Sequence, residues 1–252
     1  MAEFQSFDGV RIAFETHGEG KPVLLLHGFA SDSKRNWHRT GLVEALSAAG
    51  YRTIAPDARG HGASDKPHDE ASYGGAVLRR DVRGLMDYVG IDQCFAIGYS
   101  MGARTALGLL REEPRMRAAV LGGVGGNIFR GRSNRHEIAD ALVAKDPSGF
   151  GPTPRAFRSF ADATGADKEA LSAAMRAGLD EVTPEDLKKI TTPTLVITGD
   201  ADTLAGSPKD LADALGTGRS VVVTGDHLNA IFDPLFSKST IEFLDEQEMS
   251  EA

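Results

Sequence analysis

Short apolar runs alternate with amphipathic segments along most of the chain. Val23–Leu26 is an uninterrupted apolar run, which is typical of a strand buried on both faces of a parallel sheet. Leu78, Val82 and Leu85 keep helical spacing and predict one apolar helix face. Similar patterns predict strands at 52–55, 94–97, 118–121, 194–198 and 220–223, and helices at 42–49, 103–110, 209–215 and 231–244. This alternation predicts an α/β fold with a mostly parallel sheet and helices on both faces.

Two segments depart from the alternation. Phe4–Phe7 and Val10–Glu15 flank the turn-forming pair Asp8-Gly9, which predicts an antiparallel hairpin at the start of the chain. From residue 127 to residue 189 the pattern is helical, at 138–145, 157–163 and 169–179, without a convincing strand. We therefore expect a core of residues 1–126 and 190–252, interrupted by a helical cap of residues 127–189.

Composition narrows the class of protein. The 252 residues are 41% hydrophobic and 25% charged, which is typical of a globular chain and excludes a disordered one. The single cysteine, Cys94, excludes an intrachain disulfide and a cysteine-based zinc cluster. A formal net charge of -8 argues against a general nucleic-acid binder. The sequence shows neither a secretory signal pattern nor an apolar run of roughly 18 residues. We therefore expect a cytoplasmic protein that does not associate with membranes.

The segment Gly98-Tyr99-Ser100-Met101-Gly102 is the sharpest chemical signal. It follows a predicted strand and opens a predicted helix, which is the context that a Gly-x-Ser-x-Gly nucleophile elbow requires. Small residues are needed two positions before and after the serine because the strained turn brings the flanking backbones together. Ser100 is therefore the candidate nucleophile.

A serine nucleophile needs a base, and the base needs an orienting acid. His227 follows the last predicted strand and is the candidate base. Asp200 and Asp202 both follow the strand at 194–198, so either could supply the acid in the chain order serine, acid, histidine. Aspartates at such places also commonly brace loops, and both readings stay open at this point.

Nearly the whole chain resembles the α/β-hydrolase superfamily, in its esterase/lipase-like branch with a small helical cap. The motifs are Leu26-His27-Gly28-Phe29, Asp57–Ser64, the elbow, Pro193–Asp202 and Gly225-Asp226-His227. The resemblance implies an eight-stranded, mostly parallel sheet flanked by helices. It favours Asp202 as the acid, because the family places it last in a Gly-x-x-Asp pattern. It also implies an oxyanion hole formed by the backbone N–H groups of Phe29 and Met101, and no cofactor.

The resemblance implies a serine hydrolase that cleaves carboxylic esters of small to medium acyl groups. Lactone hydrolysis, C–C bond hydrolysis and perhydrolysis use the same triad and remain alternatives, as does a ligand receptor that does not turn over. Haloalkane dehalogenases and epoxide hydrolases in the superfamily use an aspartate nucleophile. A serine at position 100 therefore disfavours these two activities. Candidate acyl-pocket residues, which could equally form the cap's own core, are Phe129, Phe150 and Phe157, with Ile128, Phe160 and Met175.

The remaining features predict little further chemistry. Of seven histidines, His27 and His61 are expected to brace loops, and no ligand spacing such as His-Glu-x-x-His predicts a metal site. Residues 127–160 carry six basic side chains against three acidic ones, which could attract a carboxylate-bearing substrate or form a solvated surface. The basic residues are Arg130, Arg132, Arg135, Lys145, Arg155 and Arg158. We expect a small-molecule ester as the binding partner, and a monomer or homodimer.

Overall fold

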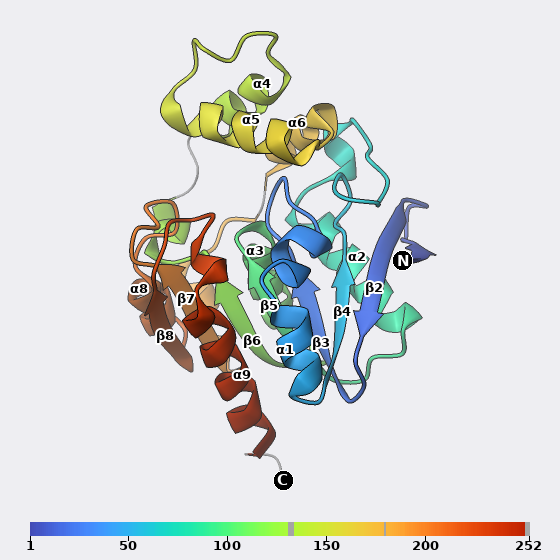
Figure 1. Ribbon diagram of the computed structural model, residues 1–252, viewed down its shortest axis with the longest axis vertical. Helices are drawn as coiled ribbons and strands as arrows, with labels where there is room; N and C mark the ends of the chain where they lie inside the picture. Colours follow the sequence, from blue (N-terminus) through green and yellow to red (C-terminus); the bar gives the residue numbers. More distant parts are fainter. Residues whose placement is uncertain (131–133, 179, 250–252) are drawn as a thin grey trace.

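Eight strands form one sheet at the centre of the computed structural model, which describes residues 1–130, 134–178 and 180–249 (Figure 1). The strands are β1 (Ala2–Gln5), β2 (Arg11–His17), β3 (Lys21–Leu26), β4 (Tyr51–Pro56), β5 (Cys94–Tyr99), β6 (Met116–Gly122), β7 (Thr194–Gly199) and β8 (Gly218–Val223). Their order is β1-β2-β4-β3-β5-β6-β7-β8. The β1–β2 and β2–β4 pairs are antiparallel, and all the other pairs are parallel. The predicted hairpin and the mostly parallel eight-stranded sheet are confirmed.

Helices cover both faces of this sheet, as the alternating pattern predicts. Because side chains along a strand point alternately to opposite faces, Leu24 and Leu26 join one apolar core and Val23 and Leu25 join the other. The first core is closed by α2 (Gly75–Tyr88), α3 (Met101–Leu110) and α8 (Pro208–Ala214). The second is closed by α1 (Leu42–Ala48) and α9 (Pro234–Met249).

The predicted start of the last helix, 231–244, is wrong. The structure has a short 3-10 turn, η4 (Ala230–Phe232), and then α9, which begins at Pro234. Asp233 between them is extended, with φ -65° and ψ 127°. A proline disfavours the helical conformation in the residue before it but suits the first position of a helix, so Pro234 separates the two segments.

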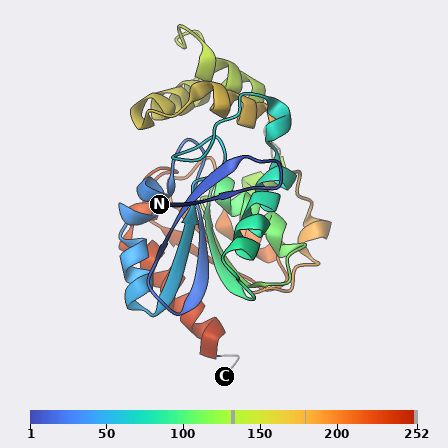
Figure 2. The same ribbon diagram turned by 90° about the vertical axis from the view of Figure 1, so that its right-hand side faces the viewer.

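Five helical segments lie between β6 and β7 in the part of the chain that the structure describes. They are η3 (Gly126–Arg130), α4 (Arg135–Val143), α5 (Pro152–Thr164), α6 (Lys168–Ala177) and α7 (Pro184–Leu187). Figures 1 and 2 show α4, α5 and α6 as a separate layer beyond one end of the sheet. Ile138, Leu142 and Leu171 give this layer an apolar core of its own, which extends to Phe29 and Ala30 of the sheet unit. This layering supports our proposal that residues 127–189 form a cap, although residue 179, within the predicted third cap helix, lies outside the described residues.

Two short segments complete the surroundings of the site. These are η1 (Lys34–His38), which has π-helical hydrogen bonding, and the 3-10 turn η2 (Glu70–Ser72). Among the described residues, no helix combines the length and the apolar character that a membrane crossing requires.

Candidate active site

Ser100 lies on a strained turn between β5 and α3. Its φ of 51° and ψ of -105° are rare for a residue with a Cβ atom. A Cβ on Gly98 would lie 2.6 Å from the Cα of Ala103, and one on Gly102 would overlap the carbonyl of Leu26. The turn therefore requires glycine on both sides of the serine, which is the physical reason for the motif.

The structure brings the side chains of Ser100, His227 and Asp202 together in one line. The Nε2 atom of His227 lies 3.0 Å from Oγ of Ser100, and its Nδ1 atom lies 2.8 Å from Oδ2 of Asp202. The Asp202 side chain is fully buried, while that of His227 is 13% exposed. A carboxylate at Nδ1 favours the tautomer that carries its proton there, and this leaves Nε2 free to accept the serine proton.

The two candidate acids do different things. The backbone N–H groups of Leu204 and Ala205 donate to Oδ1 of Asp202 at 3.0 and 2.9 Å, so the other oxygen is held toward His227. Asp200 instead accepts a hydrogen bond from the backbone N–H of Gly225 at 2.9 Å. Asp200 thus braces the loop that carries the histidine, and it is Asp202 that contacts the imidazole.

Tyr99, the residue before Ser100, holds the loop that carries His227. Its hydroxyl donates to the backbone carbonyl of His227 at 2.9 Å. Burial raises the pKa of this phenol well above its ordinary value, so it remains a donor throughout the ordinary pH range. The residue before the serine thus holds the backbone of His227, in addition to the contact between the Ser100 and His227 side chains.

The expected oxyanion donors lie on two segments that meet at Ser100. Met101 is the first residue of α3, and backbone N–H groups in a first helical turn have no partner within the helix. On the other side, a Cβ on Gly28 would lie 3.6 Å from the Cβ of Ser100, so the Gly28–Phe29 backbone runs directly beside the nucleophile. The Gly28 N–H donates to Oδ1 of Asn36 at 3.0 Å, which ties this loop to η1.

His27 and His61 are buried and hold the surrounding loops. Nδ1 of His27 donates to the carbonyl of Gly28 at 2.8 Å, and its Nε2 accepts from the N–H of Ala58 at 2.9 Å. Nδ1 of His61 donates to the carbonyl of Arg59 at 3.0 Å. Burial lowers the pKa of His61 to about 3, so this imidazole stays neutral at ordinary pH.

Two cavities flank the nucleophile. The smaller, of about 300 Å³, lies beside both Ser100 and His227. Its apolar wall includes Phe157 and Phe160 of α5, which are three residues apart and so share one helix face. Four further apolar residues line it, namely Leu204, Leu228, Ile231 and Phe232.

The larger cavity, of about 620 Å³, lies beside Ser100 and Met101 under the cap. Phe129, Ile128 and Met175 line it, as the sequence suggests for an acyl pocket. Phe150 lines neither cavity. Its N–H donates to the carbonyl of Pro147, so Phe150 lies in the turn that precedes α5 and not on the helix that carries Phe157.

The basic residues of the cap have separate positions. Arg130 and Arg135 line the larger cavity together with Arg104 of α3 and the acidic Glu181. Arg158 instead donates to three carbonyl oxygens at the end of α4, those of residues 141, 142 and 144. Arg155 lines neither cavity, and Arg132 lies outside the described residues.

Several residues of the site are not among those predicted from the sequence. Asn36, Arg35 and Arg39 of the η1 region line the smaller cavity, and Asn36 also holds the Gly28 loop. Leu228 and Leu204 could have been found from their positions, since each lies within two residues of a triad candidate. Asn36 could not, because an asparagine eight residues from a glycine has no characteristic spacing.

This arrangement can transfer an acyl group. A hydroxyl bonded to an imidazole, which is bonded in turn to a buried carboxylate, can attack a carbonyl carbon while its proton moves to the imidazole. Two cavities that meet at the hydroxyl can receive the two sides of such a substrate.

Comparison with known proteins gives one family. The model of the family described as alpha/beta hydrolase fold matches residues 21–179. Epoxide hydrolase 2 from Siraitia grosvenorii is 41% identical over 101 residues, which are 40% of this chain and 31% of that protein. A 2-hydroxy-6-oxo-6-phenylhexa-2,4-dienoate hydrolase from Burkholderia cepacia is 37% identical over 125 residues, 47% of this chain and 43% of that protein. This chain thus spans less than half the length of either curated relative.

A solved structure matches over nearly the full length. The enol-lactonase from Burkholderia xenovorans LB400 has a TM-score of 0.75 and 25% identity, covering 97% of this chain and all of that one. The similarity therefore extends through the cap as well as through the sheet.

Proposed function

Because the chain belongs to the alpha/beta hydrolase fold family, we propose that it is a serine hydrolase that cleaves carboxylic esters of small to medium acyl groups. The observation that carries this proposal is the 3.0 Å contact between Nε2 of His227 and Oγ of Ser100, with Asp202 at 2.8 Å behind the imidazole. These distances are within hydrogen-bond reach for a nucleophile, its base and an orienting acid.

In the first half of the reaction, Oγ of Ser100 attacks the ester carbonyl carbon and its proton passes to Nε2 of His227. Asp202 keeps the imidazole in the reactive tautomer and stabilises it when charged. The N–H groups of Phe29 and Met101 hold the negative oxygen of the tetrahedral intermediate, at about 3 kcal/mol for one such donor. The carbon–oxygen bond to the alcohol then breaks, and His227 gives its proton to the departing alcohol.

In the second half, water attacks the acyl group that Ser100 now carries. His227 takes a proton from this water, and the tetrahedral intermediate collapses to release the carboxylic acid. The proton returns from His227 to Oγ, which restores the starting state. The cycle consumes one ester and one water, and the chain itself supplies every proton transfer.

A serine nucleophile favours a carbonyl substrate over an epoxide, although the name of one relative is epoxide hydrolase. Attack of a serine hydroxyl on an epoxide carbon would leave an ether, which has no carbonyl carbon for water to attack. The enzyme would then be blocked after one event. An acyl-serine is an ester, which water cleaves by the same chemistry that formed it.

A second candidate is hydrolysis of substrates that carry a carboxylate. Arg130, Arg135 and Arg104 line the larger cavity, and guanidinium groups pair with carboxylates in a bidentate way. The dienoate named for one relative is an acidic substrate of C–C bond hydrolysis, and an enol-lactone is a cyclic ester. Acidic lactones or acidic diketones are therefore the alternative substrate class for the same triad.

Hydrolysis of p-nitrophenyl esters from acetate to octanoate tests the main proposal. The purified protein is expected to release p-nitrophenol over many turnovers, with the highest kcat/KM among the shorter chains. Ser100→Ala should reduce kcat by several orders of magnitude. Ser148→Ala, which removes an exposed cap serine whose hydroxyl contacts Asp146, is the matched control and should keep the full rate.

Two results would contradict the proposal. Undiminished turnover in Ser100→Ala would show that another group carries the chemistry. A burst of one equivalent followed by tight retention of the acyl group would instead indicate a ligand receptor with this fold.

A further inference from the structure

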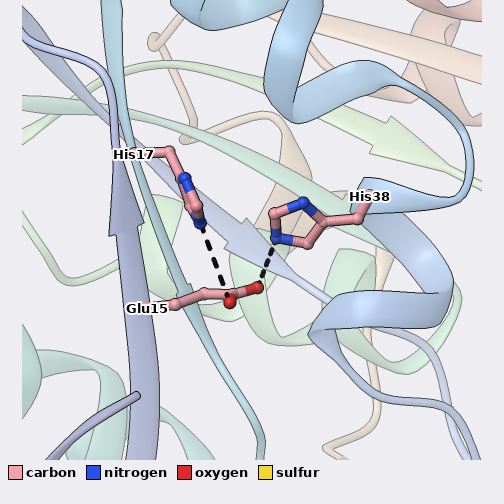
Figure 3. Close-up of side chains that lie close together, drawn as sticks. All are labelled: Glu15, His17 and His38. Carbon is pink, nitrogen blue, oxygen red and sulfur yellow. Dashed lines mark hydrogen bonds and ion pairs between the residues drawn. The ribbon is translucent and has the colours of Figure 1, made fainter.

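We propose that Glu15, His17 and His38 form a binding site for a divalent transition-metal ion of the Zn²⁺ type. The three side chains come from β2 and from the last residue of η1, and both imidazoles point at the same carboxylate (Figure 3). None of the three lines the two cavities beside Ser100, so this site is separate from the acyl-transfer site.

The ligand atoms of the three side chains lie close together. Nε2 of His38 lies 2.6 Å from Oε1 of Glu15, and Nε2 of His17 lies 3.8 Å from Oε2 of the same carboxylate. The three ligand atoms all lie within 4.8 Å of one another. Tetrahedral Zn²⁺ with ligands at about 2.0–2.1 Å separates its ligand atoms by about 3.3 Å, so small side-chain rotations suffice to enclose an ion.

The backbone fixes two of the ligands. Glu15 and His17 are two residues apart on a strand and therefore project from the same face. Both pair with β4, Glu15 opposite Ala55 and His17 opposite Thr53. Their side chains are 20% and 45% exposed and that of His38 is 22% exposed, so the site is partly enclosed yet open to solvent on the His17 side. An ion can enter there without any rearrangement of the core.

The surroundings of His38 suit a metal ion at its Nε2 atom. Its Nδ1 atom lies 3.4 Å from Oε1 of Glu44, while its Nε2 faces Glu15. A neutral imidazole has a single N–H and can donate to only one of these two carboxylates. Either a second proton on the ring or a metal ion at Nε2 satisfies both carboxylates, and with the metal ion Nδ1–H donates to Glu44. A carboxylate behind a histidine ligand is a common outer contact of zinc sites, where it orients the ring.

The ligand types match Zn²⁺. Two imidazoles and one carboxylate are ligands that Zn²⁺ accepts readily, and water can fill a fourth position. No sequence motif predicts this metal site, because such motifs hold their ligands at close spacing and His38 lies 21 residues beyond His17. Only the packing of η1 against the end of β2 brings His38 to the other two.

Metal binding at this place would tie η1 to the sheet. The same short segment carries Asn36, which holds the Gly28–Phe29 loop through the 3.0 Å bond to the Gly28 N–H. We therefore expect the ion to stabilise the folded protein, since a ligand that binds only the folded state raises Tm.

Isothermal titration of the chelator-treated full-length protein with ZnCl₂ tests the site. The wild type is expected to bind one equivalent and to gain in Tm, and excess Mg²⁺ should not compete because it prefers all-oxygen sites. His17→Ala and His38→Ala should each weaken binding at least about 100-fold, and Glu44→Gln by about 10-fold. Absorption of the Co²⁺ form reports imidazole ligation directly and should change in both histidine variants.

His136→Ala is the matched control, since it removes an exposed histidine of α4 outside the cluster and should leave Zn²⁺ affinity unchanged. If His38→Ala does not fold, His17→Ala decides the question, because His17 is the most exposed of the ligands. The proposal is overturned if the wild type shows no saturable site, or if His17→Ala binds Zn²⁺ as tightly as the wild type does.

Discussion

The Nδ1 atom of His227 lies 2.8 Å from Oδ2 of Asp202, and the carboxylate of this aspartate is entirely buried. Asp200, two residues earlier, bonds to the backbone of Gly225 instead. A turn in which the Asp202 N–H donates to the carbonyl of Gly199 separates the two side chains. Two neighbouring carboxylates thus have distinct surroundings, and their removal should have distinct effects.

Asp202→Asn is expected to lower kcat about 10⁴-fold, because an amide in place of the carboxylate stabilises the wrong tautomer of His227. Asp200→Asn is the matched variant and should be mild, since it weakens only the brace to Gly225. Steady-state kinetics on one p-nitrophenyl ester measures both. A larger loss in Asp200→Asn than in Asp202→Asn would contradict the assignment of the acid.

Gly102→Ala should destabilise the fold by about 3 kcal/mol and abolish activity, because the added Cβ overlaps the backbone carbonyl of Leu26. A shift of this backbone also moves His27 and the Gly28–Phe29 loop. Gly149→Ala meets nothing within 4 Å and should stay within about 0.5 kcal/mol of the wild type. Urea denaturation together with an ester assay distinguishes the two, and equal stability of both variants would refute the packing argument.

Asp81→Ala should cost about 3–5 kcal/mol of unfolding free energy, because it leaves the guanidinium of Arg59 partly unpaired in a buried site. The Arg59 side chain is fully buried and Asp81 is 7% exposed, with Nε to Oδ2 at 2.7 Å. The Lys209–Asp213 pair is exposed on both sides, so Asp213→Ala should cost less than about 1 kcal/mol. Similar losses in the two variants would show that burial does not set the difference.

His61 should make stability depend on pH. Its folded-state pKa of about 3 lies below the ordinary value of 6.5, so between these values the unfolded chain binds a proton that the folded chain does not. The stability contributed by neutral His61 is therefore fully present above pH 6.5 and is lost as the pH falls toward 3, at about 1.4 kcal/mol per pH unit.

Urea denaturation at pH 7.5 and pH 5 checks this dependence. The wild type should lose about 2 kcal/mol more than His61→Gln between these conditions, since the variant lacks the titrating group. Every other ionisable group is shared by the two proteins and cancels in the difference. Parallel losses in the two proteins would contradict the prediction.

Arg135→Ala should lower kcat/KM for acidic lactones or diketones about tenfold or more, while neutral esters keep their rate, if the larger cavity binds a carboxylate. Arg155→Ala removes a cap arginine that lines neither cavity and is the matched control. An equal loss on neutral and acidic substrates in Arg135→Ala would remove the carboxylate-binding role of this arginine.

Local patterns carry much of the fold, because they reflect the period of each element. The apolar run at Val23–Leu26 and the spacing of Leu78, Val82 and Leu85 predict a strand and a helix that the structure contains. The glycines around Ser100 likewise point to the elbow, since the steric demand lies within five consecutive residues. Pro234 shows the limit of periodicity, because one backbone restriction divides an apolar pattern that looks continuous.

The sequence by itself determined the order of the strands along the chain, the elbow and a short set of candidate acids, because each depends on neighbours in the chain. Only the tertiary structure decided which aspartate contacts His227, that Phe150 lies away from both cavities, and that His38 meets Glu15. The choice of acid is between two aspartates that a single turn separates. The other two relations depend on residues that are far apart in sequence. Packing of the sheet and its helices sets such distances, and local sequence patterns do not predict them.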